Sequence, residues 1–166
     1  MENDADELVL CARYGEEEEL KALLESHGQN EAFVNHQNEW GQSALQCAAA
    51  NGHAGIVKML LEAGADPNRQ NKEGNTPLHW AALMGQADCL RLMLETGKAD
   101  VNARNLQGRT ALDEAHDKGH SKAFDLLVEK QALPGQKAIE EAEKLNEMPE
   151  EEAEEALAAA DGVAEQ

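Results

Sequence analysis

Short apolar runs that end in glycine recur along the chain. The runs are LVLCARYG, LQCAAANG, LHWAALMG and LDEAHDKG, which begin at Leu8, Leu45, Leu78 and Leu112. Their closing glycines are 37, 33 and 34 residues apart. Within each run Leu and Ala recur at the spacing of one buried helical face, and a fixed period of this length is typical of repeat proteins. The pattern therefore predicts four copies of one helical unit.

The third copy shows how the unit begins and ends its first helix. Thr76 is a favourable N-cap, and Pro77 follows in the first turn, where its missing N–H costs nothing. Leu78 and Ala82 lie on one helical face, and Gly85 can end the helix because it tolerates a left-handed backbone. These residues predict a short helix between positions 76 and 85.

A second helix and an extended finger complete the unit. Leu90, Met93 and Leu94 have helical spacing, and Gly97 stops that helix. The segment 99–108 then turns back as a finger that reaches Gly108 in the frame Asn-x-x-Gly. Such a pair of short helices cannot bury its apolar side alone, so neighbouring units must stack. We expect an all-α solenoid of four helix-turn-helix repeats with finger loops.

The ends of the chain depart from the pattern. We expect a flexible segment at 1–4 and four repeats over 5–133, at about 5–37, 38–70, 71–104 and 105–133. The first repeat has a longer connection, and the last one carries Asp113 and His116, which we expect on its outer face. Residues 134–166 hold eleven acidic residues and two lysines, and predict an acidic tail that is partly helical or disordered.

The net charge of −19 limits the partners of the chain. Phosphate backbones repel such a surface, so we expect no direct nucleic-acid binding. A basic protein client is favoured because opposite charge raises the rate of encounter; the alternative is that the charge only keeps the chain soluble. We expect no secretory signal and no membrane span, a location in the cytoplasm and nucleus, and a monomer when free.

No pattern of catalytic or metal-binding residues is present in the sequence. His116 and His120 have the i, i+4 spacing of a zinc pair, but Gly119 should interrupt the helix between them. His79 is expected to form hydrogen bonds within its repeat, and the three cysteines, which lack metal-ligand spacing, are expected to be buried thiols. We therefore expect neither a catalytic site nor a cofactor, and we predict that the protein is not an enzyme.

The candidate binding positions are those that the repeat itself does not require. They are the finger tips and the residues just before each closing glycine, which should line the concave face of a curved solenoid. They are Arg13, Tyr14, Glu39, Trp40, Gln42, Asn51, Lys72, Glu73, Asn75, Leu83, Met84, Leu106, Arg109 and Asp117. An apolar series among them, from Tyr14 and Trp40 to Leu106, is typical of an interaction site. The alternative for Trp40 and Leu106 is packing against neighbouring fingers.

Residues 71–82, NKEGNTPLHWAA, resemble the T-P-L-H-x-A signature of the ankyrin-repeat family, and the likeness extends over residues 5–133. Within that family the frames LVLCARYGEEEELKALL and RNLQGRTALDEAHDKG, with the acidic tail, resemble the small acidic fungal chaperones of the Yar type. This resemblance implies a client, the KH-domain small-subunit ribosomal protein three, in ribosome biogenesis. The alternative is a general ankyrin adaptor or inhibitor that docks on a signalling or transcription protein.

Overall fold

The computed structural model describes residues 2–27 and 30–130. Helices account for the regular structure of these residues, which contain no β-strand but only an isolated bridge between Gln37 and Ser43. The prediction of an all-α repeat fold is confirmed for this part of the chain. The predicted acidic tail at 134–166 lies outside the described residues.

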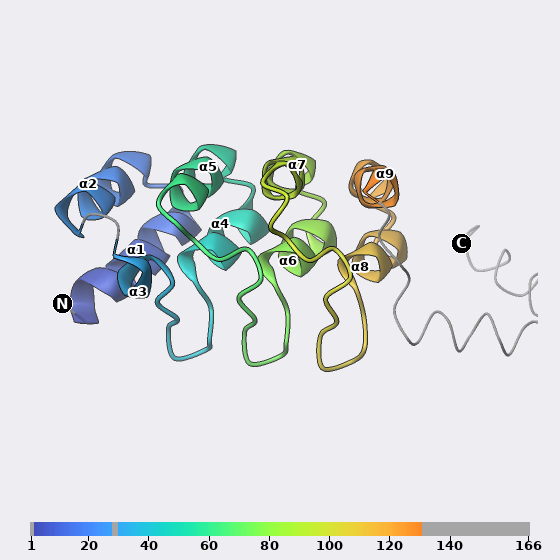
Figure 1. Cartoon of the computed structure of the whole chain (residues 1–166), viewed down its shortest axis with the longest axis horizontal. Helices are drawn as coiled ribbons and strands as arrows, with labels where there is room; N and C mark the ends of the chain where they lie inside the picture. The colour runs from blue at the N-terminus through green and yellow to red at the C-terminus, as the bar shows by residue number, and fades with distance from the viewer. Residues whose placement is uncertain (1, 28–29, 131–166) are drawn as a thin grey trace, which may run out of the picture. The chain divides into compact units, whose positions relative to one another are not determined.

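Helix pairs stack in two layers (Figure 1). The inner layer, from which the fingers extend, contains α1 (Glu2–Tyr14), α4 (Ala44–Asn51), α6 (Pro77–Leu83) and α8 (Ala111–Asp117). The outer layer contains α2 (Glu17–His27), α5 (Ala54–Glu62), α7 (Ala87–Glu95) and α9 (Ser121–Glu129), and α3 (Glu31–Val34) joins the first two repeats. Each inner helix contacts the next inner helix, so buried Leu and Ala side chains form one continuous core.

In the two central repeats, the second residue of the eight-residue run links its repeat to the next. In the second repeat this residue is Gln46, whose Oε1 accepts the Ser43 backbone N–H at 3.0 Å and caps α4. Its Nε2 donates to the carbonyl oxygens of Arg69 and Asn75, both at 2.8 Å. One buried side chain therefore satisfies a free N–H at the start of its own helix and also holds the next finger in place.

His79 performs the same two tasks in the third repeat. Its Nδ1 accepts the Thr76 backbone N–H at 3.1 Å, so the proton of the neutral ring is on Nε2, which donates to the Arg109 carbonyl at 2.9 Å. The predicted hydrogen bond within the repeat is confirmed, and a second bond reaches the next repeat. Burial lowers the pKa of His79 from its ordinary value, because desolvation disfavours the charged ring.

The corresponding residue of the last repeat is Asp113, and its expected place on an outer face is wrong. Its side chain is buried, and Oδ2 accepts the Thr110 backbone N–H at 2.7 Å to cap α8. An ionised carboxylate can only accept hydrogen bonds, so it has no donor for the finger of a further repeat. Asp113 caps its helix without extending the series, whereas His116 is exposed as predicted.

The turn between the two helices of a repeat also requires a close approach. Gly85 has a φ of +69°, and a Cβ atom there would lie 2.7 Å from Nδ1 of His120 in the next repeat. The His120 Nε2 donates to the Leu83 carbonyl at 3.1 Å. Glycine is therefore required twice, for the left-handed backbone and for the space that the stacked imidazole occupies.

The first repeat begins with a helix whose start contacts the end of α2. Helix α1 begins at Glu2, within the segment 1–4 that the sequence predicted to be flexible. Acidic residues in a first turn favour the helix dipole, and the Asp4 carboxylate lies 3.4 Å from Nε2 of His27 at the end of α2. The same imidazole stacks on Phe33 of α3 with 3.9 Å between ring centroids. These contacts hold the start of α1 against the connection to the second repeat.

We predict that His79 makes the stability of the protein depend on pH. In the unfolded chain its pKa is near 6.5, whereas the folded state resists protonation. Below about pH 6.5 the unfolded chain binds more protons, so the wild type should lose up to about 1.4 kcal/mol per pH unit relative to His79→Gln. Glutamine keeps an acceptor and a donor, as Gln46 does, but does not titrate. Urea unfolding at pH 7.5, 6.5 and 5.5 measures the free energy of unfolding of both proteins. If the difference between them is the same at all three pH values, the prediction is wrong.

Candidate protein-binding surface

The fingers are shaped by one asparagine each. In the second repeat Asn38 Oδ1 accepts the backbone N–H groups of Trp40 at 3.0 Å and Gln42 at 2.9 Å. Asn71 and Asn105 form the same pair of bonds in the next two fingers. Because the asparagine satisfies the turn internally, the side chains at each tip are left outside it.

Neighbouring fingers are joined by glutamine side chains. Gln37 Nε2 donates to the Gln70 carbonyl at 2.8 Å, and Gln70 Nε2 donates to the Arg104 carbonyl at 3.2 Å. Each of these Nε2 groups also donates within its own finger, Gln37 to the Gly41 carbonyl and Gln70 to the Gly74 carbonyl. The fingers therefore form a connected row rather than independent loops, and their tips keep a fixed spacing (Figure 1).

We call the exposed residues of the fingers and inner helices the finger-side surface. Four of the predicted apolar residues are exposed on it, namely Tyr14 at 68 %, Trp40 at 58 %, Met84 at 51 % and Leu106 at 79 %. Leu83 is half-buried. Large exposed apolar side chains of this kind mark interaction sites when they share a face. The exposure of Trp40 and Leu106 argues against the alternative that they pack between fingers.

Leu10 also belongs to this surface, although it is not among the residues predicted from the sequence. It is 47 % exposed and lies one helical turn before Tyr14 on α1. Leu10 is the third residue of its run, the position that Cys47, Trp80 and Glu114 occupy in the other repeats. The variety of residues at this third position was a signal that the repeat itself does not fix it.

Several polar candidates have structural partners, which corrects the expectation that they are free. Arg13 Nη2 donates to Gln42 Oε1 at 2.7 Å, and Asn51 Nδ2 donates to the Cys47 carbonyl at 2.8 Å. Asn75 Oδ1 accepts from Asn105 Nδ2 at 2.9 Å and so joins two fingers. The tip residues that remain exposed are Glu39, Lys72 and Glu73.

Arg109 and Asp117 also belong to an internal network. The Arg109 side chain is 17 % exposed, with Nε 2.8 Å from Oε1 of Glu114 and Nη2 2.6 Å from Oδ2 of Asp117. The hydrogen bond with Glu114 raises the pKa of Arg109. Burial acts to raise the pKa of Asp117, but hydrogen bonds from Arg109 and His116 outweigh it and lower that pKa. The positive charge of Arg109 is therefore neutralised within the fourth repeat.

The cysteines are buried thiols, as predicted. Burial raises the pKa of Cys11 and of Cys89 to about 11, and it raises that of Cys47 although nearby Arg13 opposes the shift. Thiols with raised pKa values stay protonated near neutral pH and are weak nucleophiles. Among residues 2–27 and 30–130 no group of three or more His, Cys, Asp or Glu is arranged to hold a metal ion. No helix in the same ranges is long and apolar enough to cross a membrane.

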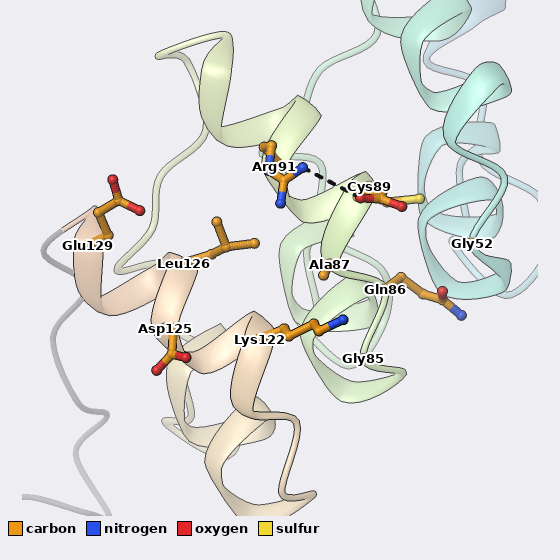
Figure 2. A pocket seen from close by; sticks show the side chains of 11 residues that line it. Gly52, Gly85, Gln86, Ala87, Cys89, Arg91, Lys122, Asp125, Leu126 and Glu129 are labelled. Atoms are coloured by element: carbon orange, nitrogen blue, oxygen red, sulfur yellow. Dashed lines mark ion pairs between the residues drawn. The ribbon is translucent and has the colours of Figure 1, made fainter.

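An open groove of about 530 Å³ lies in the outer layer (Figure 2). Lys122 extends from α9 toward α7, and Arg91 forms an exposed ion pair of 3.6 Å with Asp88. Asp125 and Glu129 add opposite charge on α9. Exposed pairs of mixed sign are typical of a solvated surface, and none of the predicted binding residues lines this groove.

Comparison with known families agrees with this geometry. The family model described as ankyrin repeats, in three copies, matches residues 3–71 and 63–138. No curated protein matches the chain. The matched residues include every finger and helix pair described above.

We predict that Arg109→Met lowers the free energy of unfolding by about 2 kcal/mol, because it leaves the mostly buried Glu114 carboxylate without its partner. The matched control is Arg91→Met, whose exposed ion pair with Asp88 should be worth less than about 0.5 kcal/mol. Urea unfolding of both variants at pH 7 measures the two losses. Equal losses in the free energy of unfolding would show that the ion pairs of Arg109 stabilise the fold no more than an exposed pair does.

Proposed function

The chain belongs to the ankyrin-repeat family, and we propose that it is a chaperone that holds a basic ribosomal protein on its finger-side surface. Ankyrin repeats are protein-binding modules, typically without enzymatic activity, and stacked repeats supply an extended binding surface. The observation that carries the proposal is the exposed apolar series on this surface, to which Tyr14, Trp40, Met84 and Leu106 contribute. Such residues are suited to cover the apolar parts of a client that would otherwise aggregate.

The distribution of charge supports a basic client. Apart from Glu39 and Glu73, the finger tips carry few acidic residues, and Asp117 is already paired with Arg109. Many exposed acidic residues lie instead on the outer helices, including Glu17, Glu18 and Glu19 in the first turn of α2. A net charge of −19 attracts a basic protein over a distance, whereas close contact is made by apolar side chains.

The resemblance to the Yar-type chaperones supports one client in particular. It implies the basic KH-domain small-subunit ribosomal protein, which must be kept from aggregation and from premature contact with RNA. An acidic chain repels RNA, so it can compete with RNA for the same basic client surface. On this proposal the protein is a monomer when free and acts in the cytoplasm and nucleus.

We predict that the purified protein keeps this ribosomal protein soluble at physiological salt and blocks its binding to ribosomal RNA. Light scattering measures aggregation of the ribosomal protein, and a filter-binding assay measures its binding to ribosomal RNA. The control is an unrelated ankyrin protein of similar net charge, which tests whether charge alone is sufficient. If both proteins protect the client equally, the chain has no specificity for it, and the adaptor or inhibitor function takes the place of the chaperone.

We further predict that Tyr14→Ala with Trp40→Ala weakens client binding by about 2 kcal/mol, roughly 30-fold, as expected for aromatic residues at the centre of an interface. Both side chains are exposed, so the thermal midpoint should change little. The matched control is Val128→Ala, which removes a half-exposed apolar side chain from outer helix α9. Calorimetric titration measures the affinity for the client. If the double variant binds the client as tightly as the wild type, these residues do not belong to the interface.

A further inference from the structure

A small cavity of about 60 Å³ lies between the inner helices of the first three repeats. Arg13 lines it from α1 and Trp80 from α6, while Gln42, Cys47 and Asn51 line it from α4 and the preceding finger. It lies among the inner helices that carry the finger-side surface, and the repeat contacts described above leave it unfilled. Its volume is sufficient for a small polar group.

The Trp80 indole contributes an unsatisfied hydrogen-bond donor. Its Nε1 atom is buried and, within the part of the chain that the structure describes, forms no hydrogen bond. An indole N–H can only donate, so it requires an acceptor oxygen. Buried polar groups without a partner are rare in folded proteins and call for a water or a ligand at the site.

Arg13 contributes a positive charge to the same cavity. It is half-buried and donates to the neutral Gln42 Oε1, but it forms no ion pair with any residue in the ranges 2–27 and 30–130. Its side chain also interacts with the Cys47 thiol, which carries no charge when protonated, so no carboxylate in these ranges neutralises Arg13. Arg109 in the fourth repeat shows the contrast, because Glu114 and Asp117 of its own repeat neutralise it.

The third position of the run explains this difference. In the fourth repeat it holds Glu114, whose carboxylate pairs with an arginine. In the second and third repeats it holds Cys47 and Trp80, neither of which carries a negative charge. The residues that line the cavity thus include a cation and a tryptophan whose buried indole N–H has no partner, and no described Asp or Glu lines it.

We propose that this cavity is a carboxylate subsite, in which an Asp or Glu side chain of the bound protein pairs with Arg13 and accepts a hydrogen bond from Trp80 Nε1. The inference rests on the proposed function in that a bound protein brings the carboxylate. Charge-assisted hydrogen bonds from arginine are strong and directional. The subsite adds specificity that overall charge lacks, because net charge attracts every basic protein, whereas the subsite selects one with an acidic residue at the matching place.

The test observes the indole N–H directly in the full chain. The chain has two tryptophans, so a ¹H–¹⁵N spectrum contains two indole signals, and Trp40→Phe assigns them. The probe is N-acetylglutamate N-methylamide, and its neutral match is N-acetylglutamine N-methylamide. At low salt we expect the glutamate probe to shift the Trp80 signal saturably, with a dissociation constant at least tenfold lower than that of the glutamine probe.

The variant Arg13→Gln should weaken binding of the glutamate probe at least tenfold, whereas Arg91→Gln in the outer layer should leave it unchanged. Backbone amide signals that keep their positions away from residue 13 show that the variant is folded. Equal shifts with both probes, an unshifted Trp80 signal, or an Arg13→Gln variant that binds normally would each overturn the subsite. The titration uses no client, so if the probe binds while the ribosomal protein does not, only the proposal about the client is wrong.

Discussion

The structure depends on a hydrogen bond that crosses from one repeat to the next. Gln46 and His79 each cap their own helix and also bind a backbone carbonyl of the following finger. Because these side chains are buried, their polar atoms must find partners, and only one register of neighbouring repeats supplies them. The same register sets the spacing of the fingers, so it also positions every residue of the finger-side surface.

The parts of the fold that were predictable from the sequence depend on short-range rules. Thr76, Pro77 and Gly85 mark helix ends through local backbone preferences, and a period of about 33 residues places the helices. The partners of the site residues were not predictable. Arg13 meets Gln42 from 29 positions away, and such a contact exists only once the stacking register is known. Helix α3 was missed although Asn30, its N-cap, is a local signal.

Charge and apolar contact act over different distances on this molecule. The acidic side chains of the outer helices are exposed, so salt screens them and they contribute to encounter rather than to stability. Tyr14 and Trp40 act only on contact, because removing apolar surface from water requires that the partner touch it. A partner that met only the charge would bind weakly and without selectivity, whereas the finger-side surface adds shape and apolar area.

Recognition can therefore vary from repeat to repeat without a change in the fold. The second position of the run is constrained in the last three repeats, where Gln46, His79 and Asp113 cap their own helices. The third position is not, and it holds Leu10, Cys47, Trp80 and Glu114 in turn. In the fourth repeat the residue is Glu114, which neutralises Arg109. In the second and third repeats it is Cys47 and Trp80, so the charge of Arg13 and the indole N–H of Trp80 are left without a carboxylate among the described residues. Because buried polar groups need partners, a repeat that lacks an internal carboxylate leaves its donors to a water or to a carboxylate of the bound protein.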